Sequence, residues 1–291
     1  MFFDKNKFAS ELDSFSPDHI IAQPDHWRAG VVFASPHSGS IYPEALIKHA
    51  KLSAHQLRRN EDIYIDHLFH SASAAGAPLL RAIFPRVMVD VNRAPDELPP
   101  IWADDLAQPT PRAAAGLGVV PTYVSESQAI YATLPSRAQV RTRIERLYHP
   151  YHAALQGLIS AASARFGQCL LVDCHSMPGF APMGSRRPDV ILGDRFGSAC
   201  HPDTLAHVQD CFIRAGYNVG VNYPYAGGFV TTHYGQPQDG VEAIQIEINR
   251  DLYVNPVTLS PKSGYVTLAE NLRGIIAEII EARTPQAIAA Q

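Results

Sequence analysis

Cysteine is scarce in this sequence. The 291 residues contain four cysteines, none of them spaced as C-x-x-C. So few cysteines in a chain of this length do not make the disulfide framework that stabilises small secreted domains. The first fifteen residues interleave charges with aromatics and lack the apolar core of a signal peptide. No uninterrupted run approaches the ~18 apolar residues of a membrane span. We therefore expect a cytoplasmic protein that does not bind a membrane.

An excess of positive charge is also missing. The chain carries 24 Lys and Arg against 28 Asp and Glu, a formal net charge of -4. Because phosphate backbones are bound by an excess of Lys and Arg, this balance argues against nucleic acid as a partner. Neither a P-loop nor G-x-G-x-x-G follows the first predicted strand, and H-E-x-x-H is absent. The sequence thus disfavours nucleotide binding and a zincin-type protease.

Apolar runs that read as strands alternate with helical periodicity along the whole chain. At 46% hydrophobic and 18% charged residues, the composition is that of an ordinary globular protein. No repeat or linker marks a boundary, so we predict one α/β domain over residues 1–291. The predicted strands are 30–35, 79–92, 168–174, 189–193, 217–222 and 241–249, and the predicted helices are 44–58, 62–75, 137–166, 202–215 and 265–283. Long loops are expected at 93–124 and, rich in glycine, at 223–240.

Two histidines stand where predicted strands end. His37 lies in FASPHSG and His175 in LLVDCHSMPG, each after an apolar run and each followed by Ser. In open α/β sheets ligands gather outside the carboxyl ends of strands. A lone histidine in such a place is usually a hydrogen-bonded structural residue, but with two in matching contexts a metal site is an equally good interpretation. One nearby carboxylate would complete the three protein ligands of a catalytic zinc.

The acidic partner has two candidates. Glu61 and Asp62 open the segment EDIYIDHLF, at a predicted helix start. Carboxylates are also favoured there by the helix dipole alone, so a structural role is an alternative for either residue.

A cluster of charged residues occupies PRVMVDVNR. If this segment is a strand, Arg86, Asp90 and Asn92 share one face and Arg93 begins the next loop. They form either an internal ion pair or a site for an anionic substrate, since guanidinium groups bind carboxylates bidentately.

The last candidates lie near the predicted strand 241–249. Gln245, Glu247 and Asn249 fall on one face, which is either solvated or carries a general base at Glu247. His233 lies in GGFVTTHYG, whose glycines suit a loop that faces substrate.

Taken together, several of these segments resemble the N-formylglutamate amidohydrolase family. The resemblance covers roughly residues 30–255 and rests on SPHSG, EDIYIDHLF, RVMVDVNR, LLVDCHSMPG, DVILGDRFG and NYPYAGGFVTTHYG…QIEINRDLY, in family order. It implies a three-layer α/β/α sandwich with a mixed sheet, similar to the zinc carboxypeptidases and to the aspartoacylase and succinylglutamate desuccinylase group. It also implies a single zinc ion, or another divalent metal such as cobalt.

The resemblance assigns roles residue by residue. His37, Asp62 and His175 would be the metal ligands, although related zinc hydrolases keep a Glu three residues after the first histidine, where this chain has Ser40. Asn92 and Arg93 would grip a substrate carboxylate, Arg86 would polarise the scissile carbonyl, and Glu247 would be the general acid and base.

The reaction implied is metal-dependent hydrolysis of N-formyl-L-glutamate to formate and L-glutamate, which would fit histidine catabolism. One alternative is a zinc amidohydrolase of the same fold that acts on another N-acyl amino acid or a small peptide. A second alternative is a non-catalytic protein that binds small carboxylates through Arg86 and Arg93. The partner is in each case a small molecule, and the sequence leaves the oligomeric state open.

Overall fold

The computed structural model describes residues 12–103, 109–124, 128–180 and 184–285. The chain divides into two compact units that interleave along the sequence. The first unit is Met1–Ile20, Pro36–Ile63 and Arg81–Ala154, and the second is Ile21–Ser35, Tyr64–Leu80 and Leu155–Gln291. The prediction of a single domain over residues 1–291 stays a prediction.

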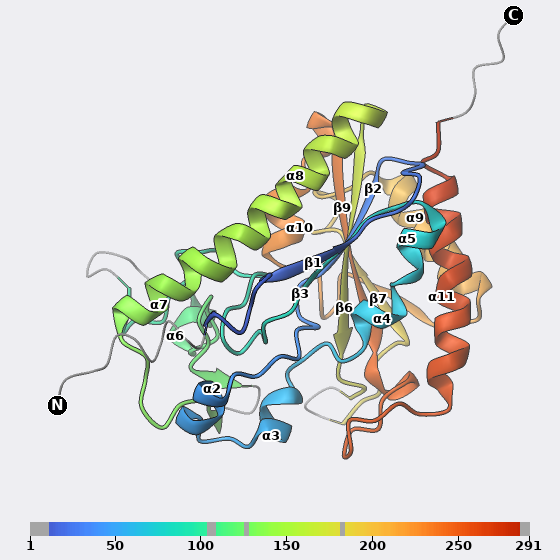
Figure 1. The fold of residues 1–291 in the computed structure, drawn as a ribbon. Coiled ribbons are helices and arrows are strands. Elements are labelled where there is room, and N and C mark those ends of the chain that lie inside the picture. The colour runs from blue at the N-terminus through green and yellow to red at the C-terminus, as the bar shows by residue number, and fades with distance from the viewer. Residues whose placement is uncertain (1–11, 104–108, 125–127, 181–183, 286–291) are drawn as a thin grey trace, which may run out of the picture. The chain divides into compact units, whose positions relative to one another are not determined.

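Seven strands within the described residues form one sheet, in the order β1-β3-β2-β6-β9-β7-β8 (Figure 1). The strands are β1 His19–Ala22, β2 Val31–Ser35, β3 Leu79–Ala82, β6 Cys169–Met177, β7 Val190–Gly193, β8 Val219–Val221 and β9 Val241–Asn249. A separate antiparallel pair is formed by β4 Tyr123–Val124 and β5 Gln128–Ala129.

The sheet is mixed, as the family resemblance implies. Strands β2, β6 and β9 run parallel to one another, β7 is parallel to β8, and β7 is antiparallel to β9. Every residue of β2, β6 and β7 is buried. Strands that are covered on both faces read as continuous apolar runs, which is why these three were readily predicted.

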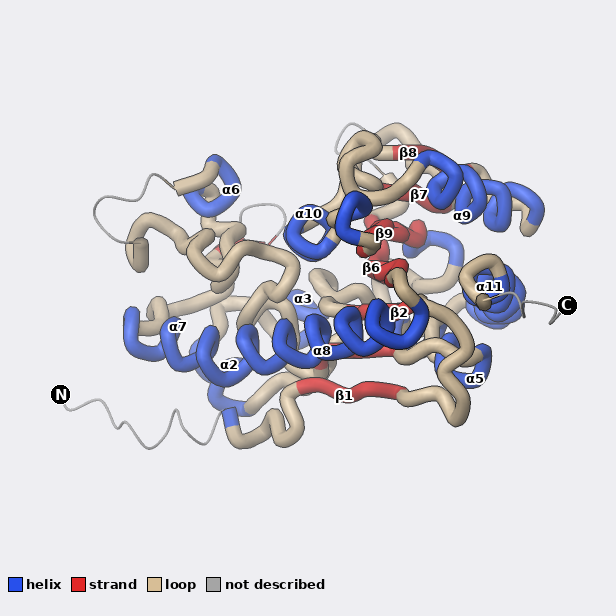
Figure 2. Tube along the Cα trace, turned by 90° about the horizontal axis from the view of Figure 1, so that it is seen from above, coloured by secondary structure: helices blue, strands red, loops and turns tan. Residues whose placement is uncertain are grey.

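Helices cover both faces of the sheet in the second unit. Helices α5 Ser71–Ala75, α9 Pro202–Arg214 and α11 Gly264–Glu281 lie on one side of β6, β9 and β7, and α10 Phe229–Tyr234 lies on the other (Figure 2). The short helix α4 Ile65–Leu68 contacts β6 and α11. The face of α11 that was predicted to be apolar is buried; it consists of Leu268, Leu272, Ile275, Ile276, Ile279 and Ile280. The predicted α/β architecture with a mixed sheet between helical layers is therefore confirmed.

Glu242 anchors the α9 and α11 side of the sheet. From β9 its carboxylate accepts the Thr204 hydroxyl and the His201 backbone N–H, and it pairs with Arg283 Nη2 at 2.7 Å. Burial alone would raise the pKa of Glu242, but these donors hold that pKa below the ordinary 4.5. The ionised carboxylate thus ties β9 to the start of α9 and to the residues that follow α11.

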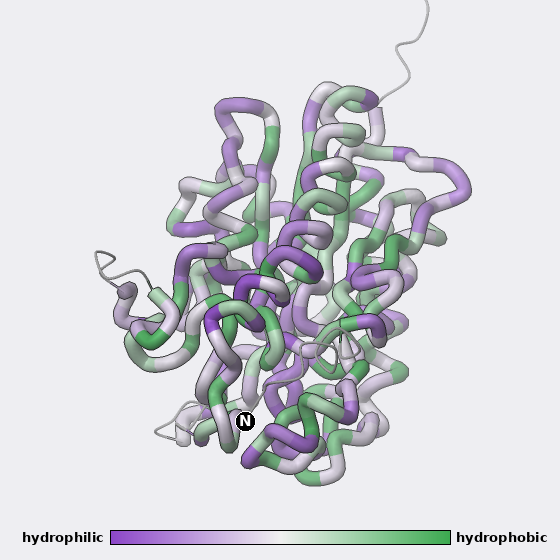
Figure 3. Tube along the Cα trace, turned by 60° about the vertical axis from the view of Figure 1, so that its left-hand side comes forward, coloured by the Kyte–Doolittle hydropathy of each residue, from purple (hydrophilic) through white to green (hydrophobic). Residues whose placement is uncertain are grey.

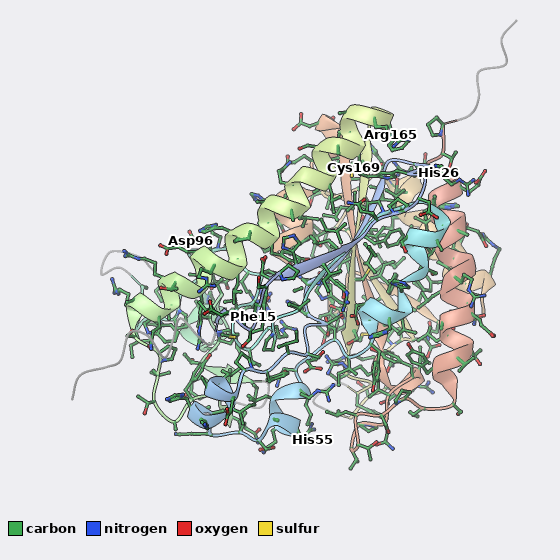
Figure 4. All side chains as sticks on the ribbon, in the orientation of Figure 1. Phe15, His26, His55, Asp96, Arg165 and Cys169 are labelled. Atoms are coloured by element: carbon green, nitrogen blue, oxygen red, sulfur yellow. The ribbon has the colours of Figure 1, made fainter. Side chains whose placement is uncertain are left out.

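The first unit contains short helices joined by long irregular segments. The helices are α2 Glu44–His49, α3 Ala54–Arg58, α6 Pro111–Ala114, α7 Arg137–Arg143, a π-helical turn at Ile144–Tyr148, and the first residues of α8 His149–Phe166. Phe15, labelled in Figure 4, packs edge-on against Phe84 in this unit's core. The helical stretch predicted from 137 to 166 is continuous. A π-helical turn lies just before Pro150, whose ring nitrogen cannot donate a backbone hydrogen bond.

Four predicted segments are wrong in detail. Residues 44–58 and 62–75 each hold two short helices rather than one, and Tyr64 before α4 has a left-handed φ of 63°. Within 79–92 only Leu79–Ala82 is a strand. Val87, Val89 and Val91 alternate along this segment as in a half-buried strand. Met88 between them is buried as well, so the burial itself does not alternate. The predicted loop 223–240 contains α10 and a 3₁₀ turn at Pro237–Asp239.

Hydrophobic and hydrophilic stretches alternate along the chain (Figure 3). Among the described residues no helix combines the length and the apolar composition needed to cross a membrane.

Candidate metal centre

His37 is fixed by its own backbone and by two carboxylates. It lies two residues beyond the end of β2 and is 2% exposed. Its carbonyl accepts the Asp62 N–H at 3.0 Å, and the Ser38 hydroxyl donates to the Asp62 carbonyl. The imidazole Nε2 lies 2.7 Å from Asp90 Oδ1, and Nδ1 lies 3.4 Å from Asp62 Oδ2. The SPHSG motif thus brings His37 and Asp62 together although they are distant in sequence.

The glycine of SPHSG permits a close backbone approach. A Cβ atom at Gly39 would overlap the carbonyl of Phe84 well inside van der Waals contact. Ile41 N–H donates to the Ile83 carbonyl in the same region. Glycine is needed here because the turn that carries His37 packs directly on the backbone of residues 83–84.

Asp90 is the hub of the charged cluster in PRVMVDVNR. Its carboxylate receives His37 Nε2, Arg86 Nη2 at 2.6 Å and the Asn92 backbone N–H at 2.9 Å, and Arg93 Nε lies 3.9 Å away. Burial alone would raise the pKa of Asp90, but Arg86, His37 and Arg93 hold it well below its usual value. The sequence left two interpretations of this cluster open, an internal ion pair and a site for an anionic substrate. The ion pair between Arg86 and Asp90 is present.

The segment around Asp90 is a set of turns rather than the predicted strand. Met88 N–H donates to the Pro85 carbonyl, Arg93 N–H donates to the Asp90 carbonyl, and the Asp90 side chain itself accepts from Asn92 N–H. Aspartate favours such local turns because its short side chain competes for backbone donors. The cluster therefore converges on one carboxylate and does not line a strand face.

His175 repeats the arrangement seen at His37. It lies in β6, 2% exposed, and its Nε2 is 2.9 Å from Asp173 Oδ2. The two residues share a face because side chains alternate along a strand. In both histidines a carboxylate contacts Nε2, so Nδ1 is the nitrogen that a metal ion would use. Carboxylate partners of this kind orient the ring and fix its tautomer in protein metal sites.

His37, Asp62 and His175 could hold a metal ion. All three are buried, and one ligand atom from each lies within 4.8 Å of the others. Two tetrahedral ligands at about 2.0–2.1 Å from one ion lie roughly 3.4 Å apart. The separation of 3.4 Å between His37 Nδ1 and Asp62 Oδ2 agrees with that value. Two imidazoles and one carboxylate are the donor set of a catalytic zinc site with an open position.

Glu61, the alternative ligand, is differently engaged. Its carboxylate oxygens lie 3.2 and 3.4 Å from Arg58 Nε. Burial and the adjacent Glu61 charge raise the pKa of the Tyr42 hydroxyl, which therefore stays protonated as a donor beside that carboxylate. The described metal-ligating group contains Asp62 and not Glu61.

Glu247 occupies the position in β9 that pairs with His175 in β6. It is 7% exposed, so the polar face of this strand is buried rather than solvated. Gln245 Nε2 donates to Glu247 Oε1 at 2.8 Å, and the Gly228 N–H just before α10 donates to Gln245 Oε1 at 2.8 Å. Since neighbouring parallel strands place paired residues on one face, Glu247 and His175 project to the same side.

Arg93, Asn92 and His233 are the remaining residues that the sequence predicted for the site. Arg93 donates through Nη1 to the Asn92 carbonyl at 2.8 Å and through Nε to the Leu117 carbonyl. Burial lowers the pKa of Arg93, and Asp90 opposes that shift. His233 is exposed on α10, where its ring stacks on Phe229 with centroids 4.8 Å apart. No described contact joins His233 to Glu247 or His175.

Sequence reasoning overlooked Asp173 and gave Gln245 no role of its own. Asp173 precedes His175 by two positions, and Gln245 precedes Glu247 by two. Each supports its neighbour by a hydrogen-bonding contact along one strand face. The period of two on a strand is the signal that could have identified both.

Several known proteins are similar to this chain in sequence or in fold. The family model described as N-formylglutamate amidohydrolase matches residues 29–254. The chain is 29% identical to the N-formylglutamate deformylase of Pseudomonas aeruginosa over 87% of this chain and 92% of that protein. It is 26% identical to the Pseudomonas putida N-formylglutamate deformylase over 88% and 92%. The crystal structure of N-formylglutamate amidohydrolase from Ralstonia eutropha JMP134 superposes with a TM-score of 0.85 at 32% identity, covering 91% of this chain and 98% of that one. This chain belongs to the N-formylglutamate amidohydrolase family.

Proposed function

We propose that this protein hydrolyses the amide bond of N-formyl-L-glutamate, a small-molecule substrate, to formate and L-glutamate, and that the reaction depends on a metal ion. The observation that carries the proposal is the buried group of His37, Asp62 and His175 in a chain of this family. The two Pseudomonas relatives are named N-formylglutamate deformylases, which supports the same substrate. Such an activity would fit histidine catabolism in the cytoplasm.

His37, Asp62 and His175 would hold the ion through two imidazole nitrogens and one carboxylate oxygen. Zinc, or another divalent metal such as cobalt, would supply Lewis acidity and a water whose pKa is lowered to about 7. Asp90 and Asp173 orient the two imidazoles through Nε2, which keeps the rings in the ligating tautomer.

Glu247 would act as the general base and then as the general acid. It is a buried carboxylate in the strand next to His175, on the same face. It would accept a proton from the attacking water and later donate that proton to the departing amino group. Gln245 fixes the orientation of the carboxylate by donating to Oε1.

The cationic cluster would serve the charges of the substrate. Arg86, held by Asp90, would stabilise the oxyanion that develops on the formyl oxygen, a contact whose loss typically costs about 10²–10³ in rate. Arg93 and Asn92 would bind a substrate carboxylate and so convert binding energy into orientation. His233, exposed on α10, would contact substrate from its stacked position on Phe229.

The test combines metal analysis with a formate assay on the purified protein, with and without chelator. We expect near-stoichiometric divalent metal and formate release that chelation abolishes and metal restores. Glu247→Gln should keep the metal and lose turnover by roughly 10²–10⁴. Release of acetate or succinate from the matching N-acyl glutamates in preference to formate would identify a different amidohydrolase. A protein without metal and without amidase activity would instead support a carboxylate-binding role.

A further inference from the structure

A cavity of about 310 Å³ lies in the second unit, at one end of β7. It is lined by Arg186, Arg187, Pro188, Asp189 and Asn218. None of these residues belongs to the metal-ligating group or to the general base, and sequence reasoning did not single them out.

The register of the sheet places this cavity beside Glu247. Asn249 N–H donates to the Asp189 carbonyl, Ile191 pairs with Glu247, and Val190 N–H donates to the Asn218 carbonyl. Because residues that pair across strands share a face, Asp189 and Asn218 lie on the face that carries Glu247. The cavity is thus two residues further along β9, toward the carboxyl end where ligands bind in α/β sheets.

The cavity carries one more positive than negative side chain. Arg186 Nη2 lies 3.5 Å from Asp189 Oδ1, and Asp189 Oδ2 accepts the Asn218 N–H at 3.1 Å. The Asp189 carboxylate is therefore balanced by donors within the cavity. Arg187 supplies the remaining charge, so the cavity suits a ligand with a single negative group.

Arg187 is oriented in advance of any ligand. Its Nη1 donates to the Pro178 carbonyl at 2.8 Å, its backbone N–H donates to the Gly179 carbonyl, and its guanidinium carbon lies 5.3 Å from the ring centre of Tyr225. Among the described residues its Nε is buried and donates no hydrogen bond. Arg187 as a whole is only half-buried, so the rest of its guanidinium is accessible to a ligand. The planar fork of arginine matches the two oxygens of a carboxylate.

We propose that this cavity binds the side-chain carboxylate of an acidic N-acyl amino acid, with Arg187 as its cation. The proposal rests on the proposed function and deepens it, because it names the residue that selects glutamate over neutral amino acids. Arg187 would determine specificity, whereas Arg93 and Asn92 would bind the other carboxylate.

The length of the substrate agrees with the register. Asp189 lies two residues along and one strand across from Glu247, which is about 6.6 Å along the strands and about 4.8 Å between them, or roughly 8 Å in all. In extended N-formylglutamate five bonds of about 1.5 Å follow a zigzag from the formyl carbon to the side-chain carboxyl carbon, so these two atoms lie roughly 6 Å apart. A substrate whose formyl group lies next to Glu247 therefore brings its side-chain carboxylate to the edge of the cavity, where the long Arg187 side chain would meet it, and a shorter acidic side chain stops further away.

The experiment compares N-formyl-L-glutamate with N-formyl-L-glutamine, which has the same shape but no side-chain charge. Formate release would be measured for the metal-loaded wild type, Arg187→Gln, Arg187→Lys and the control Arg214→Gln. Arg214 is an exposed arginine on α9 that pairs with Glu278, so its removal changes the net charge equally. Thermal unfolding of each variant shows whether the contacts of Arg187 with Pro178 and Tyr225 are needed for folding.

We expect the wild type to prefer formylglutamate by on the order of 10- to 100-fold in kcat/KM. Arg187→Gln should remove most of that preference through KM, with kcat and the kinetics on formylglutamine nearly unchanged. Arg187→Lys should restore part of the preference, and Arg214→Gln should retain all of it. A folded Arg187→Gln variant that keeps the wild-type preference, or that loses both substrates equally, overturns the proposal.

The proposed function fails separately, because its failure appears in the wild type as no formate from either substrate. In that event calorimetric binding of L-glutamate and L-glutamine to wild type and Arg187→Gln still tests the cavity. Preference for glutamate that depends on Arg187 supports the subsite. Equal binding of the two amino acids, or no binding, overturns it.

Discussion

The substitution Asp90→Asn tests whether the charged cluster supports His37 in its proposed role as a metal ligand. The change keeps the size of the side chain and removes its charge. Asp90 now accepts from His37 Nε2 at 2.7 Å, from Arg86 at 2.6 Å and from the Asn92 N–H at 2.9 Å. An asparagine retains one acceptor oxygen for these donors and turns an amide group toward the others.

Two magnitudes follow from this geometry. Breaking a buried ion pair by removing one partner costs about 3–5 kcal/mol, and Asp90 is 2% exposed beside two arginines. Loss of the carboxylate that orients a ligating histidine typically weakens metal binding by about 10- to 100-fold. We therefore expect Asp90→Asn to lower both the free energy of unfolding and the affinity for the metal.

The assay separates the two effects. Guanidinium unfolding of the metal-free protein gives the stability change alone, and competition with a chromogenic chelator gives the affinity of the folded protein for zinc. Asp173→Asn is the matched comparison, because Asp173 contacts His175 Nε2 at 2.9 Å as Asp90 contacts His37 Nε2. It should weaken zinc binding to a similar extent.

A folded Asp90→Asn protein with wild-type zinc affinity would refute this reasoning. Asp90 would then serve only to neutralise Arg86 and Arg93, and the short contact with His37 would have no bearing on the metal.

Three further predictions concern other parts of the structure. Gln245→Leu should leave metal content intact and lower kcat about ten-fold in the formate assay, because Glu247 loses the donor on Oε1; an unchanged kcat would contradict this. Gly39→Ala should lower thermal stability and metal content together, because its Cβ overlaps the Phe84 carbonyl; Gly157→Ala, with open space around it, is the control. Glu242 has a pKa held below the ordinary 4.5, so its stabilisation is complete above 4.5 and is lost as pH falls through the folded-state value. The stability gap between wild type and Glu242→Gln, from urea unfolding at several pH values, should therefore shrink below pH 4.5, and a gap that widens in acid would contradict the assignment.

The sequence predicts the two histidines well because their position follows from local pattern. A buried parallel strand is a short apolar run, and the residue that follows it lies at the carboxyl edge of the sheet. His37 lies two residues beyond β2 and His175 lies two residues before the end of β6, so both are near that edge, although β6 continues past the predicted end at 174. The parallel pairing of β2 with β6 then makes the two strands neighbours.

The same local reasoning fails for PRVMVDVNR because burial there does not alternate. Val87, Met88, Val89 and Val91 are all buried, so the apolar positions carry no period of two that reports a strand. The segment is held instead by a backbone bond from Asp90 N–H to the Val119 carbonyl and by turns around Asp90. Such a bond to a residue 29 positions away leaves no trace in the local pattern.

The carboxylates around the histidines explain why the metal reading is physically favoured over a purely structural one. Asp62, Asp90 and Asp173 are each at most 2% exposed, and each contacts one of the two imidazoles. Three buried carboxylates are costly unless cations balance them. Arg86 and Arg93 lie beside Asp90 and balance its charge. A divalent cation between His37, Asp62 and His175 would add positive charge beside these carboxylates, and Asp90 and Asp173 would orient the two rings toward it.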